Sequence, residues 1–204
     1  LRRNYMAEQL ADEKKRTFRA QQVARETVPL TGTIAETYLR GRGITCPLPV
    51  DALRYHPTCW HSSGKHLPAM VARVKGSAAY AIHRTYLKLD GSGKADLEPP
   101  KAMLGNCAGG AVRLIEAEGP LVVTEGIETA LAVHLATGKP VWAGISAGNL
   151  EKLWVPDTVR EVCIYADNDA GGDFAGQNED KVSANVAAWY TLKSCDRWLS
   201  IRLE

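Results

Sequence analysis

The hydrophobic pattern first predicts a long, weakly amphipathic helix. Residues 1–28 are rich in Glu, Gln, Lys, Arg and Ala and contain neither Gly nor Pro. Their apolar residues follow a loose helical spacing, which gives only a thin apolar stripe. Pro29 ends this pattern, because proline cannot continue the hydrogen-bond ladder of a helix. We therefore expect a surface or linking helix.

The next part, up to residue 118, has shorter and less regular signals. Thr33 is a predicted N-cap, and Glu36 three residues later completes a capping box for a short helix over 34–40. Residues 44–68 contain several prolines and few regular signals. The strand-like runs of this part are 69–74, 80–89 with its alternating pattern, and 112–115. The pattern predicts a small α+β subdomain.

From Gly119 onward, apolar runs alternate with helical segments. The predicted strands are 121–124, 141–145 and 162–166, and the predicted helices are 127–136, 149–154 and about 179–192. Strands that alternate with helices form βαβ units around a parallel sheet. The fold class that we expect is α/β, a Rossmann-type parallel sheet with helices on both faces, preceded by the smaller α+β subdomain. The predicted domains are a helical linker (1–29), a basic α+β subdomain (30–118) and the parallel α/β domain (119–204).

Charge supports this division. Residues 1–118 carry 18 Lys and Arg against 11 Asp and Glu, whereas residues 119–204 carry 7 against 12. The asymmetry indicates a basic part that holds a polyanion and an acidic part that holds a cation. The alternative is that the charges scatter over a solvated surface.

Composition narrows the class of protein. No stretch approaches the roughly 20 apolar residues of a membrane span. The five cysteines are scattered without a CxxC pair, which is typical of a reducing cytoplasm. We expect a cytoplasmic protein with no membrane partner.

Carboxylates follow two of the predicted parallel strands. Glu125 comes directly after the first strand, and Asp167 and Asp169 come after the third. In open parallel sheets the carboxyl ends of the strands meet at one edge, where ligands bind. Three close carboxylates repel one another unless a cation neutralises them, and their hard oxygen ligands suit Mg²⁺ or Mn²⁺. Asp173 is a weaker fourth candidate ligand. The alternative is that these aspartates are N-caps or turn residues.

The sequence also contains candidate residues for two other chemistries, a serine hydrolase and a zinc site. The segment 144–148, GISAG, fits a hydrolase nucleophile motif around Ser146, but that fold needs a His after the Ser, and all five histidines precede it. A zinc site would use Cys46, Cys59, His61 and His66. Their spacing does not fit a zinc ribbon or finger, so incidental polar residues in a loop are the preferred interpretation.

Two segments together resemble the Toprim domain, which bacterial-type primases, type IA and type II topoisomerases and some nucleases share. They are residues 122–131, VVTEGIETAL, and residues 166–172, ADNDAGG. The upstream part looks like primase-type Toprim proteins of phages, plasmids and other mobile elements. The segments that carry this second resemblance are 38–44, 53–57, 82–87, 90–95 and 101–105.

The resemblance implies a primase core, in which short RNA primers are made from NTPs on a single-stranded DNA template. It implies Mg²⁺ or Mn²⁺ on Glu125, Asp167 and Asp169. In such proteins a zinc-binding domain usually precedes this region and a helicase often follows, so we expect a piece of a longer protein. Candidate phosphate or template contacts are Arg84, Lys94 and Lys101, with His83 as a candidate for base stacking; a solvated strand edge or core packing is the alternative for these residues.

Two further functions stay open at this point. A Toprim nuclease would use the same carboxylates to hydrolyse phosphodiester bonds. A non-catalytic nucleic-acid-binding module of a replication or transfer protein is the third possibility. Two features of the acidic set speak for this possibility. Thr129 stands where related domains often have Asp, and the further acidic motif that bacterial primases carry after the next strand has no clear counterpart downstream of Asp169.

Overall fold

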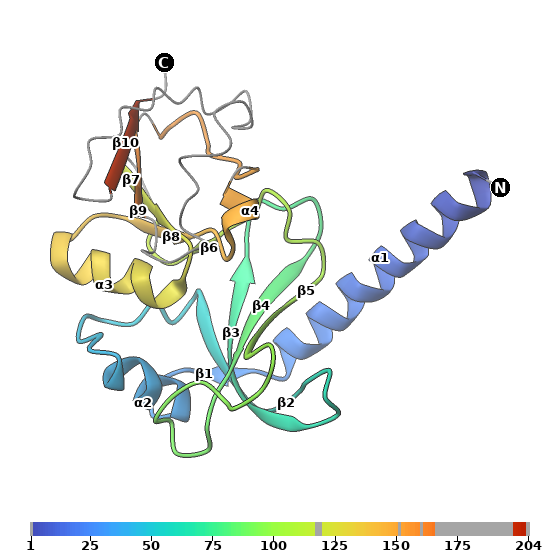
Figure 1. Ribbon diagram of the computed structural model, residues 1–204, viewed down its shortest axis with the longest axis horizontal. Coiled ribbons are helices and arrows are strands. Elements are labelled where there is room, and N and C mark those ends of the chain that lie inside the picture. The colour runs from blue at the N-terminus through green and yellow to red at the C-terminus, as the bar shows by residue number, and fades with distance from the viewer. Residues whose placement is uncertain (1, 117–119, 151, 160, 166–197, 203–204) are drawn as a thin grey trace. The chain divides into compact units, whose positions relative to one another are not determined.

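The computed structural model describes residues 2–116, 120–150, 152–159, 161–165 and 198–202 (Figure 1). The chain forms two compact units, each with its own sheet. The antiparallel unit comprises Leu1–Gly43 and Leu48–Cys107, and the parallel unit comprises Ile44–Pro47 and Ala108–Glu204. The predicted domain boundaries stay predictions beside this division.

The antiparallel unit contains a five-stranded sheet in which sequence order and spatial order coincide. The order is β1-β2-β3-β4-β5, and every neighbouring pair is antiparallel. The strands are β1 (Val28–Pro29), β2 (Leu53–Trp60), β3 (His66–Val74), β4 (Ala81–Tyr86) and β5 (Lys101–Leu104). β2 lies within residues 44–68, where the sequence showed few regular signals, and β5 was not expected. Pro57 lies where the β2–β3 register shifts, between His56 and Cys59, a position that tolerates proline because the ladder is interrupted there.

Two helices complete this unit. The predicted first helix is confirmed as α1 (Arg2–Arg25), and it packs against the sheet through Ala20, which is fully buried in a cluster with Ile82 and Tyr86. The second helix is α2 (Ile34–Gly41), also as predicted.

The capping box predicted for α2 forms in an altered way. Thr33 is the N-cap, but its side chain makes no capping hydrogen bond. The Glu36 carboxylate instead accepts the backbone N–H of Gly32 at 2.7 Å, one residue before the expected donor. The Thr33 hydroxyl donates to the Leu30 carbonyl, so it does not bond to the first turn of the helix.

The parallel unit has a mixed sheet of order β10-β9-β7-β8-β6. Its three central strands are parallel, as predicted, whereas β10 and β6 at the edges run antiparallel to their neighbours. The strands are β6 (Val112–Arg113), β7 (Leu121–Thr124), β8 (Val141–Ala143), β9 (Glu161–Tyr165) and β10 (Trp198–Arg202). The helices are α3 (Ile127–Thr137), which packs against β7 and β8, and the short α4 (Ala147–Leu150). This is the α/β class that the sequence predicts. The edge strand β10 was not expected, and the predicted helix at 179–192 lies outside the described residues.

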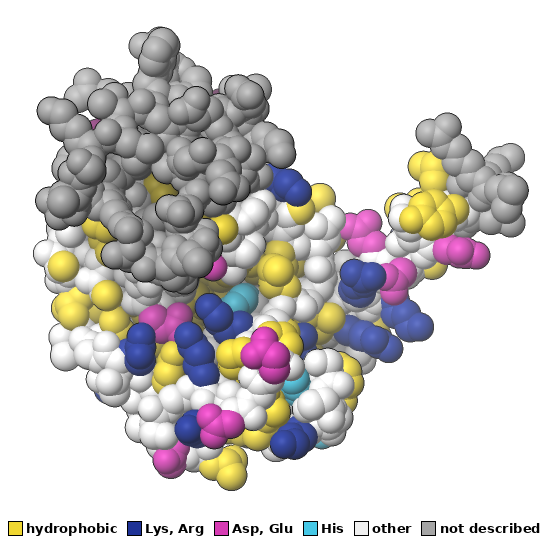
Figure 2. All heavy atoms as spheres, viewed as in Figure 1, with side chains coloured by type: hydrophobic (Ala, Val, Ile, Leu, Met, Phe, Trp, Pro, Cys, Tyr) yellow, Lys and Arg dark blue, Asp and Glu magenta, His cyan; other side chains and the backbone are white. Residues whose placement is uncertain are grey.

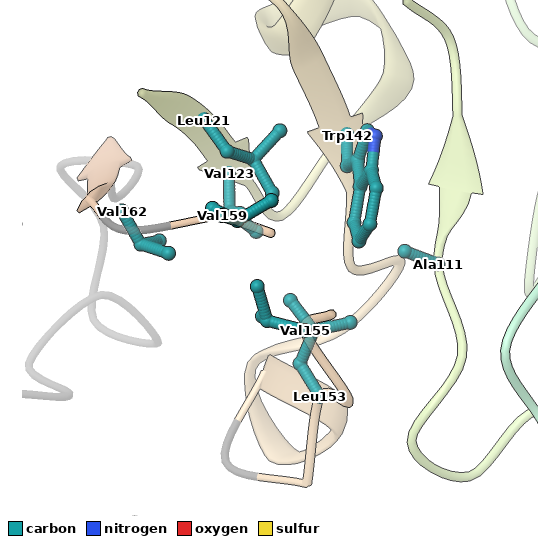
Figure 3. Close-up of a cluster of buried hydrophobic side chains, with 8 residues drawn as sticks. All are labelled: Ala111, Leu121, Val123, Trp142, Leu153, Val155, Val159 and Val162. Carbon is teal, nitrogen blue, oxygen red and sulfur yellow. The ribbon is translucent and has the colours of Figure 1, made fainter. Parts of the chain in front are cut away.

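The core of the parallel unit explains why the sequences of its strands are continuous apolar runs. Leu121, Val123, Trp142 and Val162 from the strands pack with loop residues in one cluster (Figure 3). The loop members are Ala111, Leu153, Val155 and Val159. Residues of opposite parity are buried as well, such as Val122 and Thr124 on β7, so both faces of the central strands are covered. Among the described helices, none combines the length and apolar composition that crossing a bilayer requires.

Candidate functional site

Three strand ends meet at one edge of the parallel sheet. Thr124, the last residue of β7, lies opposite Ala143 of β8 on one side and opposite Tyr165 of β9 on the other. All three strands run in the same direction, so their carboxyl ends form a row. Glu125 is the first residue beyond β7 and therefore lies at this edge, where parallel sheets place their ligands.

The turn that carries Glu125 is fixed by backbone groups. The Ile145 N–H donates to the Glu125 carbonyl at 2.8 Å, and the Gly144 N–H donates to the Thr124 carbonyl at 2.8 Å. The Thr124 hydroxyl donates to the Gly126 carbonyl at 2.7 Å. The backbone on both sides of the carboxylate is thus held by the loop that follows β8.

The Glu125 side chain differs from its surroundings because it has no polar partner. It is partly exposed, and within the described residues its carboxylate makes no hydrogen bond or ion pair. A partly desolvated carboxylate on a fixed turn suits a cation, since hard oxygen ligands are what Mg²⁺ and Mn²⁺ prefer. Glu125 therefore fits the metal-ligand role predicted for it.

Asn149 braces the loop after β8, and sequence reasoning did not identify it. Its side chain is buried and makes three hydrogen bonds. The amide oxygen accepts the Gly109 N–H at 2.9 Å, and the amide nitrogen donates to the Gly110 and Gly144 carbonyls at 2.7 and 2.9 Å. An isolated Asn in a short helical segment gives no signal for this role, because its three partners lie up to 40 residues away in the sequence.

The same loop is tightly packed and strained. A Cβ on Gly144 would lie 2.1 Å from Leu150 Cδ2, so only glycine fits there without displacing that side chain. Ile145 has a φ of 67°, which is rare for a β-branched residue and costs energy. The loop is therefore held in place by its surroundings.

The predicted aspartates Asp167, Asp169 and Asp173 lie outside the described residues. β9 ends at Tyr165, which pairs with Thr124 at the edge that holds Glu125. In the described part of the chain, no group of three or more His, Cys, Asp or Glu side chains is placed to hold a metal ion. All four residues of the alternative zinc site, Cys46, Cys59, His61 and His66, are described, and they do not come together as such a group. The His61 ring instead lies within hydrogen-bond distance of the Ser63 hydroxyl at 2.9 Å and of the Pro99 carbonyl at 3.0 Å.

Arg84, a predicted phosphate contact, is buried in the antiparallel unit. Its guanidinium donates to the Trp60 carbonyl at 3.1 Å and to the Met103 carbonyl at 3.5 Å. The same Trp60 carbonyl accepts the Tyr86 hydroxyl at 2.7 Å. Burial raises the pKa of the Tyr86 hydroxyl well above its usual value, so it stays a donor. Arg84 thus ties β4 to the ends of β2 and β5, and its contact with nucleic acid stays a prediction.

The other predicted contacts differ in exposure. His83 is buried on β4, opposite Met103 of β5. Lys101 opens β5 opposite Thr85, and Lys94 pairs through its backbone with Leu87; both side chains are partly exposed. The structure brings these residues onto one sheet and its connecting loop, and their binding roles stay predictions.

Comparison with known families gives two matches. Residues 120–198 match the Toprim domain, and residues 14–114 match a domain of unknown function (DUF7146). Comparison with curated proteins and with solved structures found no match.

Proposed function

Residues 120–198 are a Toprim domain, a fold of metal-dependent nucleic-acid-processing enzymes, and from this premise we propose that the chain is a primase core. In this proposal it joins ribonucleotides into short RNA primers on a single-stranded DNA template. The observation that carries it is the row of strand ends at Thr124, Ala143 and Tyr165. Next to it lies the Glu125 carboxylate, which has no partner among the described residues.

The proposed site would hold Mg²⁺ or Mn²⁺ on Glu125, Asp167 and Asp169, with Asp173 as a possible further ligand. When bound, the cation supplies charge neutralisation at the triphosphate and lowers the pKa of the primer 3′-hydroxyl. In the reaction, the 3′-oxygen bonds to the α-phosphorus of the incoming NTP, the bond to pyrophosphate breaks, and the hydroxyl proton leaves. The chain contributes the fixed turn at Glu125, which either holds the cation or accepts that proton.

The choice of a primase over a nuclease is supported by the upstream segments that resemble primase-type proteins. Three of them, 38–44, 53–57 and 82–87, fall largely on α2, β2 and β4 of the antiparallel unit. They therefore belong to one sheet and a helix packed on it.

The test is a primer-synthesis assay on a denaturing gel. The chain and its Asp169→Asn variant are incubated with single-stranded DNA, labelled NTPs and Mg²⁺ or Mn²⁺. Asn keeps the size of Asp but removes the anionic ligand, so we expect short labelled RNA from the wild type only. Equal product from both proteins would overturn the metal assignment.

The same gel identifies a nuclease, and DNA binding measured separately by fluorescence anisotropy identifies a binding module. Shortening of the input DNA, without labelled RNA, would show a nuclease. Binding of DNA with no product under either metal would show a binding module. Either result would replace the primase proposal.

A further inference from the structure

The second half of α1 carries a concentrated positive charge. Residues 14–25 contain five Lys and Arg and no Asp or Glu. The acidic residues of α1 all precede this stretch, and two of them are engaged: Asp12 pairs with Arg16, and Glu13 accepts the side-chain amide of Asn106 at 2.9 Å. Dark blue Lys and Arg side chains are visible along this helix in Figure 2.

The cations lie on the outward face of the helix. Ala20 faces the sheet and is fully buried, whereas Lys14, Lys15, Arg19 and Arg25 are exposed. Lys15 and Arg19 are four residues apart, so they are neighbours on one face. None of these four side chains forms a hydrogen bond or ion pair within the described part of the chain. The face is thus charged and open to a ligand.

An aromatic ring stands among these cations. Phe18 is 56 % exposed, although a phenyl ring gains stability from burial. Cations that contact phosphates, combined with aromatic rings on which bases stack, are the elements of single-strand binding. A duplex keeps its bases stacked inside and offers nothing to the ring.

We propose that the outward face of α1 over residues 14–25 binds the backbone of single-stranded nucleic acid, with Phe18 stacking on a base. The choice of a single strand among polyanions rests on the proposed function, whereas the binding itself needs neither the metal nor the carboxylates. At 1.5 Å per residue the face is about 16 Å long.

The test is fluorescence anisotropy with labelled oligo(dT) of 20 nucleotides, in EDTA and across a salt series. The variant Lys15→Glu/Arg19→Glu is compared with Arg42→Glu/Lys65→Glu, which makes the same charge change at two exposed positions outside α1. We expect at least a tenfold loss of affinity for the α1 variant and less than twofold for the control. The slope of log affinity against log salt concentration should become shallower by about 1.4 for the α1 variant. Each lost phosphate contact with a single strand contributes about 0.7, and the variant loses two contacts.

A third variant tests the stacking. Phe18→Ala should lose at least about fivefold in affinity with an unchanged salt slope, because stacking depends on the ring and not on charge. Thermal unfolding checks that each variant stays folded. Equal losses for the α1 variant and the control, an unchanged affinity of the α1 variant, or tighter binding of a duplex of the same length would each overturn the proposal.

The design keeps this inference separate from the proposed function. Asp169→Asn should abolish primer synthesis and leave oligo(dT) binding unchanged. If no primer is made under any condition but the α1 variant still loses binding, the primase proposal fails and the α1 surface stands. If primer is made and the α1 variant binds oligo(dT) normally, the α1 proposal fails and the primase proposal stands.

Discussion

The two sheets of this protein use polar side chains in opposite ways. In the antiparallel unit, β4 places His83, Arg84 and Thr85 inside the sheet, and all three are buried. In the parallel unit, the interior of β7 is apolar up to Thr124, and the charged residue follows just past the strand end. Its carboxylate, on Glu125, has no partner within the described residues.

This difference distinguishes polar groups that hold the fold together from polar groups that can bind a ligand. A polar group buried within a strand usually has a hydrogen-bond partner, because an unpaired one costs folding energy, although the buried Thr85 hydroxyl has none among the described residues. Arg84 meets this need by donating to two backbone carbonyls. A carboxylate beyond a strand end remains partly hydrated and can stay unpaired until a cation arrives. The position of a charged residue along its strand thus carries more functional information than its charge.

The largest effect should come from the loop that supports the strand ends. Asn149→Ala removes three hydrogen bonds and leaves the Gly110 and Gly144 carbonyls buried without a partner. Each such group costs about 1–3 kcal/mol, so we expect a loss of about 3 kcal/mol in the free energy of unfolding. Urea unfolding followed by circular dichroism measures it.

The matched control is Asn106→Ala in the antiparallel unit. The Asn106 amide is only partly buried and donates to the carboxylate of Glu13 on α1. Its loss should therefore lower the free energy of unfolding by about 1 kcal/mol. Equal effects of the two substitutions would contradict the bracing role of Asn149.

The next effect concerns activity. Glu125→Gln keeps the size of the side chain and removes its charge, and we expect at least about a 100-fold loss of primer synthesis. Even loss of an outer-shell partner of a metal ligand typically costs 10–100-fold. The control Glu161→Gln changes a carboxylate at the other end of β9, away from the row of strand ends, and should stay within about twofold. Comparable losses in both variants would remove the distinction between the two edges of the sheet.

A smaller effect is expected for the buried arginine. Arg84→Ala should lower the free energy of unfolding by about 2 kcal/mol, the range for hydrogen bonds that involve a charged group. Its Nε has no hydrogen-bond partner among the described residues, which keeps the expected loss moderate. Lys101→Ala, at a partly exposed position, should change stability by no more than about 0.5 kcal/mol. If Arg84→Ala were as stable as the wild type and bound DNA more weakly, Arg84 would be a ligand contact and the comparison of the two sheets would fail.

The sequence predicted the parallel unit well because its signals are local. Strand 121–124 and the helix after it match β7 and α3 nearly residue for residue, since a buried apolar run followed by a helical repeat has few other solutions. The row of strand ends follows from that order together with parallel pairing. Asn149 was missed because two of its three partners, Gly109 and Gly110, come from a distant loop, and no local pattern encodes such contacts.

The antiparallel unit was harder for a physical reason. β2 contains Pro57 at a register shift, and β5 is only four residues long and partly exposed, so neither shows the alternation of a regular strand. Arg84 was interpreted from its charge, whereas its surroundings depend on the pairing of β4 with β3 and β5. Those pairings bring together residues that are 7 to 22 positions apart, which sequence periodicity does not reveal.

The smallest effect contrasts two carboxylates: Glu125, which has no partner in the described part of the chain, and Glu36, which has one. The Gly32 N–H, and to a lesser extent Arg40, lower the pKa of Glu36 below its ordinary value of 4.5. Its stabilising effect is therefore fully present above the unfolded-state pKa and is lost as the pH falls through the folded-state value. Glu36→Gln should lower the midpoint of thermal unfolding slightly at pH 7, and the difference from wild type should shrink toward pH 3. An equal difference at both pH values would show that the charge of Glu36 does not matter. In that case the effect of the substitution would come from the changed hydrogen bonding of the amide and not from the lost charge.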